Sequence, residues 1–152
     1  MKKPAFPEFE IRPFQPQDQR EARALILAGL AEHWGELDPQ RNSDLDEIGR
    51  SYAGGLFLVA WQADRIIGTG ALMPGEIGSA QVVRMSVAKP MRRRGVGRRI
   101  LQRLIDEAKL MGVCELVLET TADWQEAIAF YQRLGFQPTH QADGDFYFRM
   151  EI

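Results

Sequence analysis

The segment that decides the fold lies in the middle of the chain and reads Val87-Ala88-Lys89-Pro90-Met91-Arg92-Arg93-Arg94-Gly95-Val96-Gly97-Arg98. It follows an alternating, strand-like segment and precedes an amphipathic, helix-like one that begins at Gly95. A helix N-terminus carries unpaired N–H groups and roughly half a positive elementary charge. Because Gly95 and Gly97 have no side chains, an anion can approach these amides directly. With its arginines, the segment predicts a binding site for a diphosphate.

The spacing of the glycines separates this segment from two other phosphate-binding loops. A Walker loop requires Gly-x-x-x-x-Gly-Lys-[Ser/Thr], and no Lys-Ser or Lys-Thr pair follows the glycines here. A dinucleotide-binding fingerprint requires Gly-x-Gly-x-x-Gly, whereas Gly95-x-Gly97 is followed by Arg98-Arg99-Ile100. The pattern Arg92-x-x-Gly95-x-Gly97 belongs to neither class.

Hydrophobic periodicity and turn residues predict the other elements. Strands are expected over Glu10–Phe14, Leu56–Trp61, Arg65–Met73, Ala80–Val87, Val113–Glu119, Phe136–Thr139 and Asp145–Glu151. Helices are expected to begin at Asp18, Ser43, Gly95 and Asp123, and Asp18-x-x-Glu21 and Asp123-x-x-Glu126 resemble capping boxes.

The order of these elements predicts one domain over residues 1–152. A strand–helix–strand unit from Val82 to Leu118 makes its two strands parallel, with a right-handed crossover. The expected fold is of the α/β (α+β) class: a mixed, mostly antiparallel sheet with one central parallel strand pair and helices on both faces. Strict alternation places Val83, Met85 and Val87 on one face of their strand.

Two stretches in the second half extend the pattern, Leu118-Glu119-Thr120-Thr121 and Ala127-Ile128-Ala129-Phe130-Tyr131-Gln132-Arg133-Leu134-Gly135-Phe136. Together with Arg92-x-x-Gly95-x-Gly97, the region from about Gly68 to Phe136 resembles the GNAT acetyltransferase superfamily. The resemblance implies an N-acetyltransferase that takes acetyl-CoA as co-substrate and needs no metal. It also implies direct attack by the primary amine of a small-molecule or amino-acid-type acceptor.

The resemblance implies roles for individual residues. In the family, the strand before the loop and the parallel strand after the helix separate, and the pantetheine arm lies between them. This implies a cofactor site formed by the backbone of Met85 and Val87 and by Arg92, Arg93, Arg94, Gly95, Val96, Gly97 and Arg98. Tyr131 matches the tyrosine that protonates the leaving thiolate. A phenol of pKa ~10 is protonated at neutral pH and can act as a general acid. The alternative role of Tyr131 is that of a core aromatic beside Phe130.

The residue that removes a proton from the acceptor amine is not identified by the pattern. Glu119, at the end of its strand, is the candidate for this catalytic base, and its alternative role is that of a surface cap. Glu36, His33 or a water chain to one of these residues are the other candidates for the base. Trp124 stands where many relatives carry asparagine, so a hydrogen bond to the cofactor arm is missing or is replaced, for instance by Gln125.

Composition excludes several classes of protein. The chain has 152 residues, and its single cysteine, Cys114, rules out an internal disulfide and a Cys-cluster zinc site. Cys114 lies in an apolar strand and is expected to be buried. No apolar run approaches the ~18 residues of a membrane span. The first residues, Met1-Lys2-Lys3-Pro4, lack the apolar core of a signal peptide, so we expect a cytoplasmic protein.

Charge is distributed unevenly along the chain, although the net charge is only −2. Residues 77–105 contain no Asp or Glu, and the acidic stretch 32–47 favours a cationic amine acceptor.

One alternative function is that of a nucleic-acid-binding module that uses Arg92–Arg94 and Arg98–Arg99. The net charge and the lack of interleaved aromatics argue against it. A second alternative is a regulatory domain that binds coenzyme A without turnover. The acceptor and the oligomeric state, a homodimer included, stay open.

Overall fold

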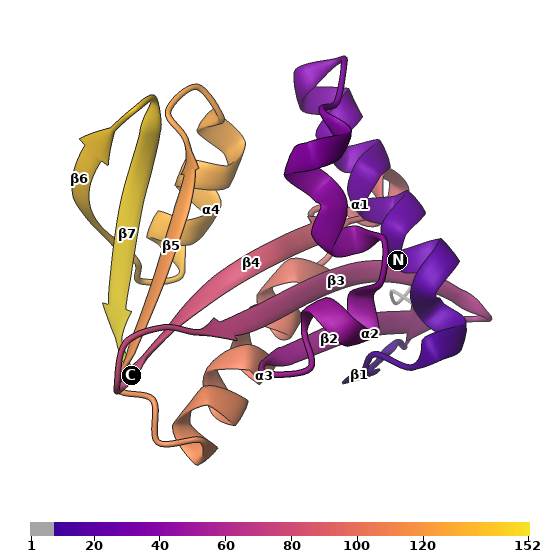
Figure 1. Cartoon of the computed structure of the whole chain (residues 1–152), viewed down its shortest axis with the longest axis horizontal. Helices are drawn as coiled ribbons and strands as arrows, with labels where there is room; N and C mark the ends of the chain where they lie inside the picture. Colours follow the sequence, from indigo (N-terminus) through magenta and orange to yellow (C-terminus); the bar gives the residue numbers. More distant parts are fainter. Residues whose placement is uncertain (1–7) are drawn as a thin grey trace, which may run out of the picture.

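Residues 8–152, which the computed structural model describes, contain a seven-stranded sheet with the strand order β1-β2-β3-β4-β5-β7-β6 (Figure 1). The strands are β1 (Glu10–Pro13), β2 (Leu56–Gln62), β3 (Arg65–Pro74), β4 (Ser79–Val87), β5 (Glu115–Thr121), β6 (Gln137–Ala142) and β7 (Asp145–Glu151). Within residues 8–152, only β4 and β5 are parallel neighbours. The predicted fold class is confirmed. The segment on which the signal-peptide prediction rests lies outside the described residues.

The helices are α1 (Gln19–Trp34), α2 (Ile48–Ser51), α3 (Val96–Leu110) and α4 (Gln125–Arg133), and the 3-10 segments are η1 (Pro16–Asp18), η2 (Pro39–Leu45) and η3 (Lys89–Met91). Apolar side chains of α3 and α4 pack on one face of the sheet around Leu104 and Phe148. Those of α1 and α2 pack on the other face, against β2, β3 and β4, around Ile26 and Ile48. On that second face, β5, β7 and β6 instead carry polar side chains around the cavity described below.

The parallel pair at the centre of the sheet is short. Its register joins Ser79 to Glu115, Ala80 to Leu116 and Gln81 to Val117, and no further pair is present in the described part of the chain. Beyond Gln81 and Val117 the two strands diverge, as Figure 1 shows. Their backbones therefore border a gap that opens toward their carboxyl ends.

A β-bulge in β4 lies beside this gap. Arg84 adopts a left-handed conformation with φ +54°, and the register with β3 shifts between Thr69 and Ala71. The buried Thr69 hydroxyl holds the bulge by donating a hydrogen bond of 2.8 Å to the Arg84 carbonyl. Such a bulge inserts an extra residue and redirects the side chains that follow.

The bulge corrects the predicted alternation of β4. Met85 and Val87 pack with Val82 against the α3 side, whereas Val83 packs on the α1 side. Strict alternation predicts Val83 on the same face as Met85 and Val87. Because the extra residue falls between them, the two groups lie on opposite faces.

The predicted capping boxes are also wrong. Asp18 pairs with Arg12 at 2.7 Å and accepts the N–H of Gln15, while Glu21 accepts the N–H of Ile66 on β3. α4 begins after Trp124, with no side-chain cap. Asp18 is thus bound to residues that precede it and Glu21 to β3, so neither carboxylate serves the cap that the pattern indicates.

Cys114 is exposed rather than buried, so that prediction is wrong as well. The residue precedes β5, and its backbone N–H donates to Gly78 O at 2.8 Å. It therefore belongs to the turn before the strand, not to the apolar strand interior.

Candidate active site

The N-terminus of α3 presents backbone amides without a side-chain cap. Gly95 is the N-cap residue, with φ +85°, and a Cβ built there would meet no atom within 4 Å. The first helical bond runs from Arg99 N–H to Gly95 O at 3.1 Å. The amides of Val96, Gly97 and Arg98 precede that bond, and none of them has an intrahelical partner. This end of the helix is suited to hold an anion.

Gly97 and Val96 also serve the packing of the helix. A Cβ at Gly97 would lie 3.3 Å from the Phe130 ring of α4. The Val96 side chain is buried in the core, where a Cβ at Gly68 would lie only 2.9 Å from it. Only the backbone of Val96 is therefore available to a ligand, and Gly97 lets α4 approach the start of α3.

Arg92 joins the loop before α3 to α1 and to β4. Its two terminal nitrogens donate to both carboxylate oxygens of Glu32 at 2.9 and 3.0 Å, and Nε donates to Val87 O at 3.0 Å. The hydrogen bonds from Arg92 lower the pKa of Glu32. Arg93, Arg94 and Arg98 are exposed around the helix end. Arg92 is thus held by contacts within the chain.

The free edge of β4 carries the two predicted backbone positions. Ala88 N–H donates to Ile67 O at 2.8 Å, so the preceding residue, Val87, turns its backbone groups toward the gap. Arg92 uses the Val87 carbonyl there. The Met85 side chain packs into the α3-side core, close to Gly70. These positions can offer backbone atoms to an extended ligand while their side chains stay packed.

Tyr131 on α4 is partly buried between two aromatic rings. Its ring centroid lies 5.1 Å from that of Phe130 and 5.7 Å from that of Phe136, both in edge-to-face geometry. Burial raises the pKa of the Tyr131 hydroxyl well above its ordinary value. The hydroxyl therefore keeps its proton at neutral pH and is in the acid form that a proton donor needs.

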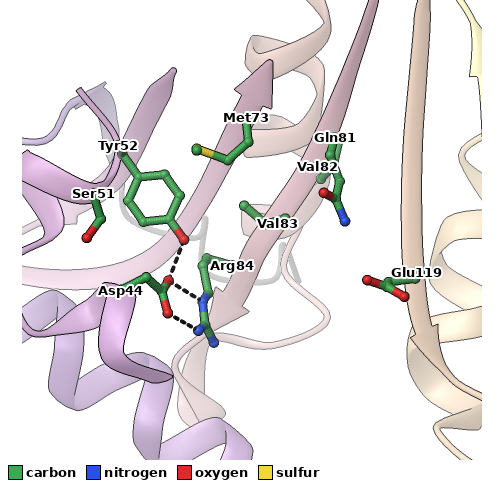
Figure 2. A pocket seen from close by; sticks show the side chains of 9 residues that line it. All are labelled: Asp44, Ser51, Tyr52, Met73, Gln81, Val82, Val83, Arg84 and Glu119. Atoms are coloured by element: carbon green, nitrogen blue, oxygen red, sulfur yellow. Dashed lines mark hydrogen bonds and ion pairs between the residues drawn. The ribbon is translucent and has the colours of Figure 1, made fainter. Parts of the chain in front are cut away.

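A cavity of about 400 Å³ lies between β4 and β5 on the α2 side of the sheet (Figure 2). Its lining residues are Asp44, Ser51, Tyr52, Met73, Gln81, Val82, Val83, Arg84 and Glu119. Figure 2 shows Glu119 on β5 directed across the gap toward β4. The cavity is thus bordered by the separated strands and by the segment that joins α1 to β2.

A polar cluster holds that segment against the bulge. Arg84 donates to Asp44 at 2.6 and 3.0 Å and to Asn42 at 3.1 Å, and the Tyr52 hydroxyl donates to Asp44 at 2.5 Å. Burial alone would raise the pKa of Asp44, but the hydrogen bonds from Arg84 and Tyr52 outweigh it and lower that pKa. Burial and Asp44 together raise the pKa of Tyr52. No pattern in the sequence indicates this cluster.

A second cavity of about 480 Å³ lies over the polar face of β5, β7 and β6. It is lined by Gln81, Glu115, Val117, Leu118, Glu119, Thr139, His140, Tyr147, Phe148 and Arg149. Tyr147 is the cross-strand partner of Glu119, and a hydrogen bond to that carboxylate raises the pKa of Tyr147. The His140 ring stacks on Tyr147 at 4.4 Å. Glu119 and Gln81 line both cavities.

The three candidates for the base lie in different surroundings. Glu119 lines both cavities, whereas Glu36 is exposed after α1. The His33 ring stacks on Trp124 at 4.0 Å, and its Nε2 lies 3.5 Å from a carboxylate oxygen of Asp123. His33 thus joins the end of α1 to the start of α4. Only Glu119 borders the gap.

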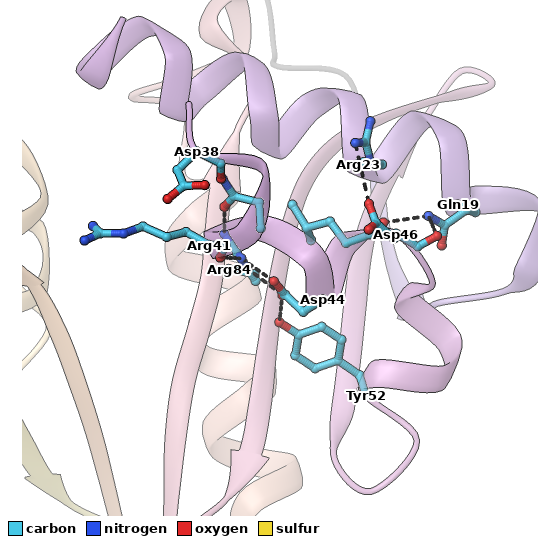
Figure 3. Close-up of polar contacts among 10 residues, drawn as sticks. Gln19, Arg23, Asp38, Arg41, Asp44, Asp46, Tyr52 and Arg84 are labelled. Atoms are coloured by element: carbon cyan, nitrogen blue, oxygen red, sulfur yellow. Dashed lines mark hydrogen bonds and ion pairs between the residues drawn. The ribbon is translucent and has the colours of Figure 1, made fainter. Parts of the chain in front are cut away.

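The acidic stretch 32–47 is largely neutralised within the chain (Figure 3). Asp44 pairs with Arg84, and Asp46 lies 3.6 Å from Arg23. Asp38 caps η2 by accepting the N–H of Gln40. These carboxylates are bound by neighbouring groups, so the stretch as a whole gives no reason to expect a cationic acceptor.

Within residues 8–152, no group of three or more His, Cys, Asp or Glu side chains is arranged to bind a metal ion. No helix in that range has the length and apolarity needed to cross a bilayer.

Comparison with known proteins places the chain among acetyltransferases. A sequence profile of the acetyltransferase (GNAT) family matches residues 13–136. IAA acetyltransferase from Azospirillum brasilense is 32% identical over 119 residues, 77% of this chain and 78% of that protein. N-acetyltransferase family 8 member 3 from Rattus norvegicus is 30% identical over 115 residues, 70% of this chain and 49% of that protein.

Solved structures share the fold. An acetyltransferase of the GNAT family from Staphylococcus aureus Mu50 has a TM-score of 0.87 at 21% identity, over 95% of this chain and 99% of that chain. The PaiA N-acetyltransferase of Thermoplasma acidophilum, solved in complex with coenzyme A, has a TM-score of 0.83 at 19% identity and the same coverage. With the profile match over most of its length, this chain belongs to the acetyltransferase (GNAT) family.

Proposed function

We propose that the chain is one cytoplasmic acetyltransferase domain, residues 1–152, which transfers the acetyl group of acetyl-CoA to the primary amine of a small molecule. The observation that carries the proposal is the uncapped N-terminus of α3 beside the gap between β4 and β5. The family uses acetyl-CoA, and the Thermoplasma relative was solved with coenzyme A. We propose no nucleic-acid partner, in keeping with the net charge of −2.

The residues present fit acetyl-CoA. Around the open space at Gly95, the amides of Val96, Gly97 and Arg98 would hold the diphosphate, assisted by the side chains of Arg92, Arg93, Arg94 and Arg98. The backbone of Met85 and Val87 would border the pantetheine arm in the gap. Acetyl-CoA supplies an acetyl group activated as a thioester.

Glu119 would act on the proton of the acceptor ammonium, and Tyr131 would act on the leaving sulfur. The Glu119 carboxylate accepts a proton from the acceptor ammonium, and the amine nitrogen then forms the C–N bond as the C–S bond breaks. Tyr131 donates its proton to the departing sulfur and regains one from the attacking nitrogen. The ammonium loses two protons in all: one ends on the thiol and Glu119 releases the other to water.

Thiol release from acetyl-CoA, measured with a panel of primary amines, tests the proposal. We expect turnover with at least one amine, lost when Arg92→Glu is combined with Arg98→Glu. A substitution at Gly97, such as Gly97→Asp, would not test ligand binding alone, because the added side chain would also meet Phe130. Arg103→Glu is the control, since Arg103 pairs with Glu107 further along α3. Coenzyme A binding without thiol release from any amine would instead support the regulatory-domain alternative.

A further inference from the structure

The two cavities adjoin at the gap, and we call them together the acceptor groove. They share Gln81 of β4 and Glu119 of β5, the two sides of the diverging strand pair. One end of the groove lies at the Asp44–Arg84 pair and the other at Arg149 on β7. An acceptor whose amine lies beside Glu119 therefore extends toward one or both of these ends.

Both cationic side chains that line the groove are already bound to carboxylates. Arg84 contacts both oxygens of Asp44, and its remaining terminal nitrogen contacts Asn42. Arg149 donates to Glu115 at 2.6 and 3.0 Å and to Glu151 at 3.2 Å. A carboxylate on the acceptor would have to displace a partner to pair with Arg84, and at Arg149 it would compete with the two glutamates already bound there.

The carboxylates that line the groove differ in whether an arginine neutralises them. Asp44 and Glu115 each face an arginine, whereas no ion pair of Glu119 is present in the part of the chain that the structure describes. The contact of Glu119 is the neutral hydroxyl of Tyr147. The uncompensated charge of the groove is therefore a single negative one, at the place where the amine must lie.

The remaining lining of the groove suits an uncharged, apolar substituent of the acceptor. Met73 and Val83 line one arm, and Val117 lines the other between Glu115 and Glu119. The stacked rings of Tyr147 and His140 form the far wall of this second arm. A hydrocarbon or aromatic group can be buried there without an unpaired charge.

Resting on the proposed function, we propose that the acceptor is a primary amine with no carboxylate on the carbon that bears the nitrogen, and that free α-amino acids are rejected. An α-carboxylate would lie within a few ångströms of Glu119 and find both arginines occupied. Two like charges at such a distance repel strongly in a partly desolvated groove. We expect kcat/KM for an amine to exceed that of the matched amino acid roughly 10- to 100-fold.

Matched acceptors test this specificity directly. The amines 2-phenylethylamine, tyramine, tryptamine and 3-methylbutylamine are compared with phenylalanine, tyrosine, tryptophan and leucine, and phenylalaninamide serves as an uncharged analogue. We expect thiol release with the amines and the amide and little with the amino acids. Equal or greater kcat/KM for the amino acids overturns the inference and leaves the proposed function intact. Coenzyme A binding without turnover of any of these acceptors counts against both.

A charge variant separates specificity from structure. Glu115→Gln removes the main carboxylate partner of Arg149 and should raise kcat/KM for phenylalanine relative to 2-phenylethylamine by about three- to tenfold. Glu151→Gln is the control, because Glu151 is the more distant partner and does not line the cavity. A purely structural role of Glu115 would lower the melting temperature without changing this ratio, and that result contradicts the inference.

Discussion

The guanidinium of Arg84 meets the carboxylate of Asp44 through two bonds, Nη2 to Oδ1 at 2.6 Å and Nε to Oδ2 at 3.0 Å. This pair joins the bulge of β4 to the segment between α1 and α2 (Figure 3). The two side chains are 16% and 30% exposed, so the pair is largely shielded from water. The wall of the acceptor groove is therefore attached to the strand that borders the gap.

Asp44→Asn should destabilise the protein by about 1–3 kcal/mol, because it leaves Arg84 without a carboxylate in a partly buried site. The folded state lowers the pKa of Asp44, so this contribution is complete above the unfolded value of about 3.9. It is lost as the pH falls through the folded pKa. Urea unfolding at neutral pH and near pH 3 measures the difference.

The matched control is Asp46→Asn. Asp46 lies 3.6 Å from Arg23, and the two side chains are 65% and 46% exposed. An exposed pair of this kind contributes about 0–1 kcal/mol. Equal losses of stability for the two variants would contradict the structural role given to the Arg84–Asp44 pair.

Gly95→Ala should cost about 1–2 kcal/mol of stability, because a residue with a Cβ is strained at φ +85°. Gly112→Ala is a matched control, since Gly112 has φ +81° and equally open surroundings at the other end of α3. Calorimetry should find coenzyme A binding weakened in Gly95→Ala only. Equal binding by the two variants would show that the Gly95 backbone does not hold the ligand.

Glu32→Gln should tighten coenzyme A binding by about two- to fivefold, because Arg92 no longer has to leave a carboxylate to reach a phosphate. The dissociation constant at low ionic strength is the quantity to measure. Weaker binding in this variant would mean that Glu32 instead positions Arg92 for the ligand.

Tyr131→Phe should lower kcat by about 100-fold or more while the dissociation constant of coenzyme A stays the same. Burial raises the pKa of Tyr131, so its acid form persists to higher pH than that of a free phenol. We therefore expect no loss of wild-type kcat from Tyr131 as the pH rises toward 10. Equal kcat in the two proteins would remove Tyr131 from the mechanism.

Glycine positions and hydrophobic periodicity were enough to predict most of the fold. The strands around Gly95 and the helix that follows it were placed within about two residues, because strong local patterns determine them. The same patterns did not reveal the bulge at Arg84, which depends on the buried hydroxyl of Thr69 on another strand. Sequence alternation carries no sign of such a contact.

The site was predicted less completely than the fold. Asp44 and Arg84 are 40 residues apart, and Glu32 and Arg92 are 60 apart, so their pairing follows only from the packing of α1 and η2 on the sheet. The sequence placed Glu119 at a strand end, but not beside Tyr147 or at the junction of two cavities. Electrostatic neutralisation of the acidic stretch likewise depends on tertiary contacts.

A titration of the ¹⁵N-labelled protein with coenzyme A, followed through its amide resonances, tests whether the N-terminus of α3 holds the diphosphate. We expect the largest shifts to fall on Val96, Gly97 and Arg98. Inorganic pyrophosphate should shift the same amides, and pantetheine, which has no phosphate, should not. Saturable binding of coenzyme A with its largest shifts elsewhere, and with these three amides unchanged, would contradict this role of the helix.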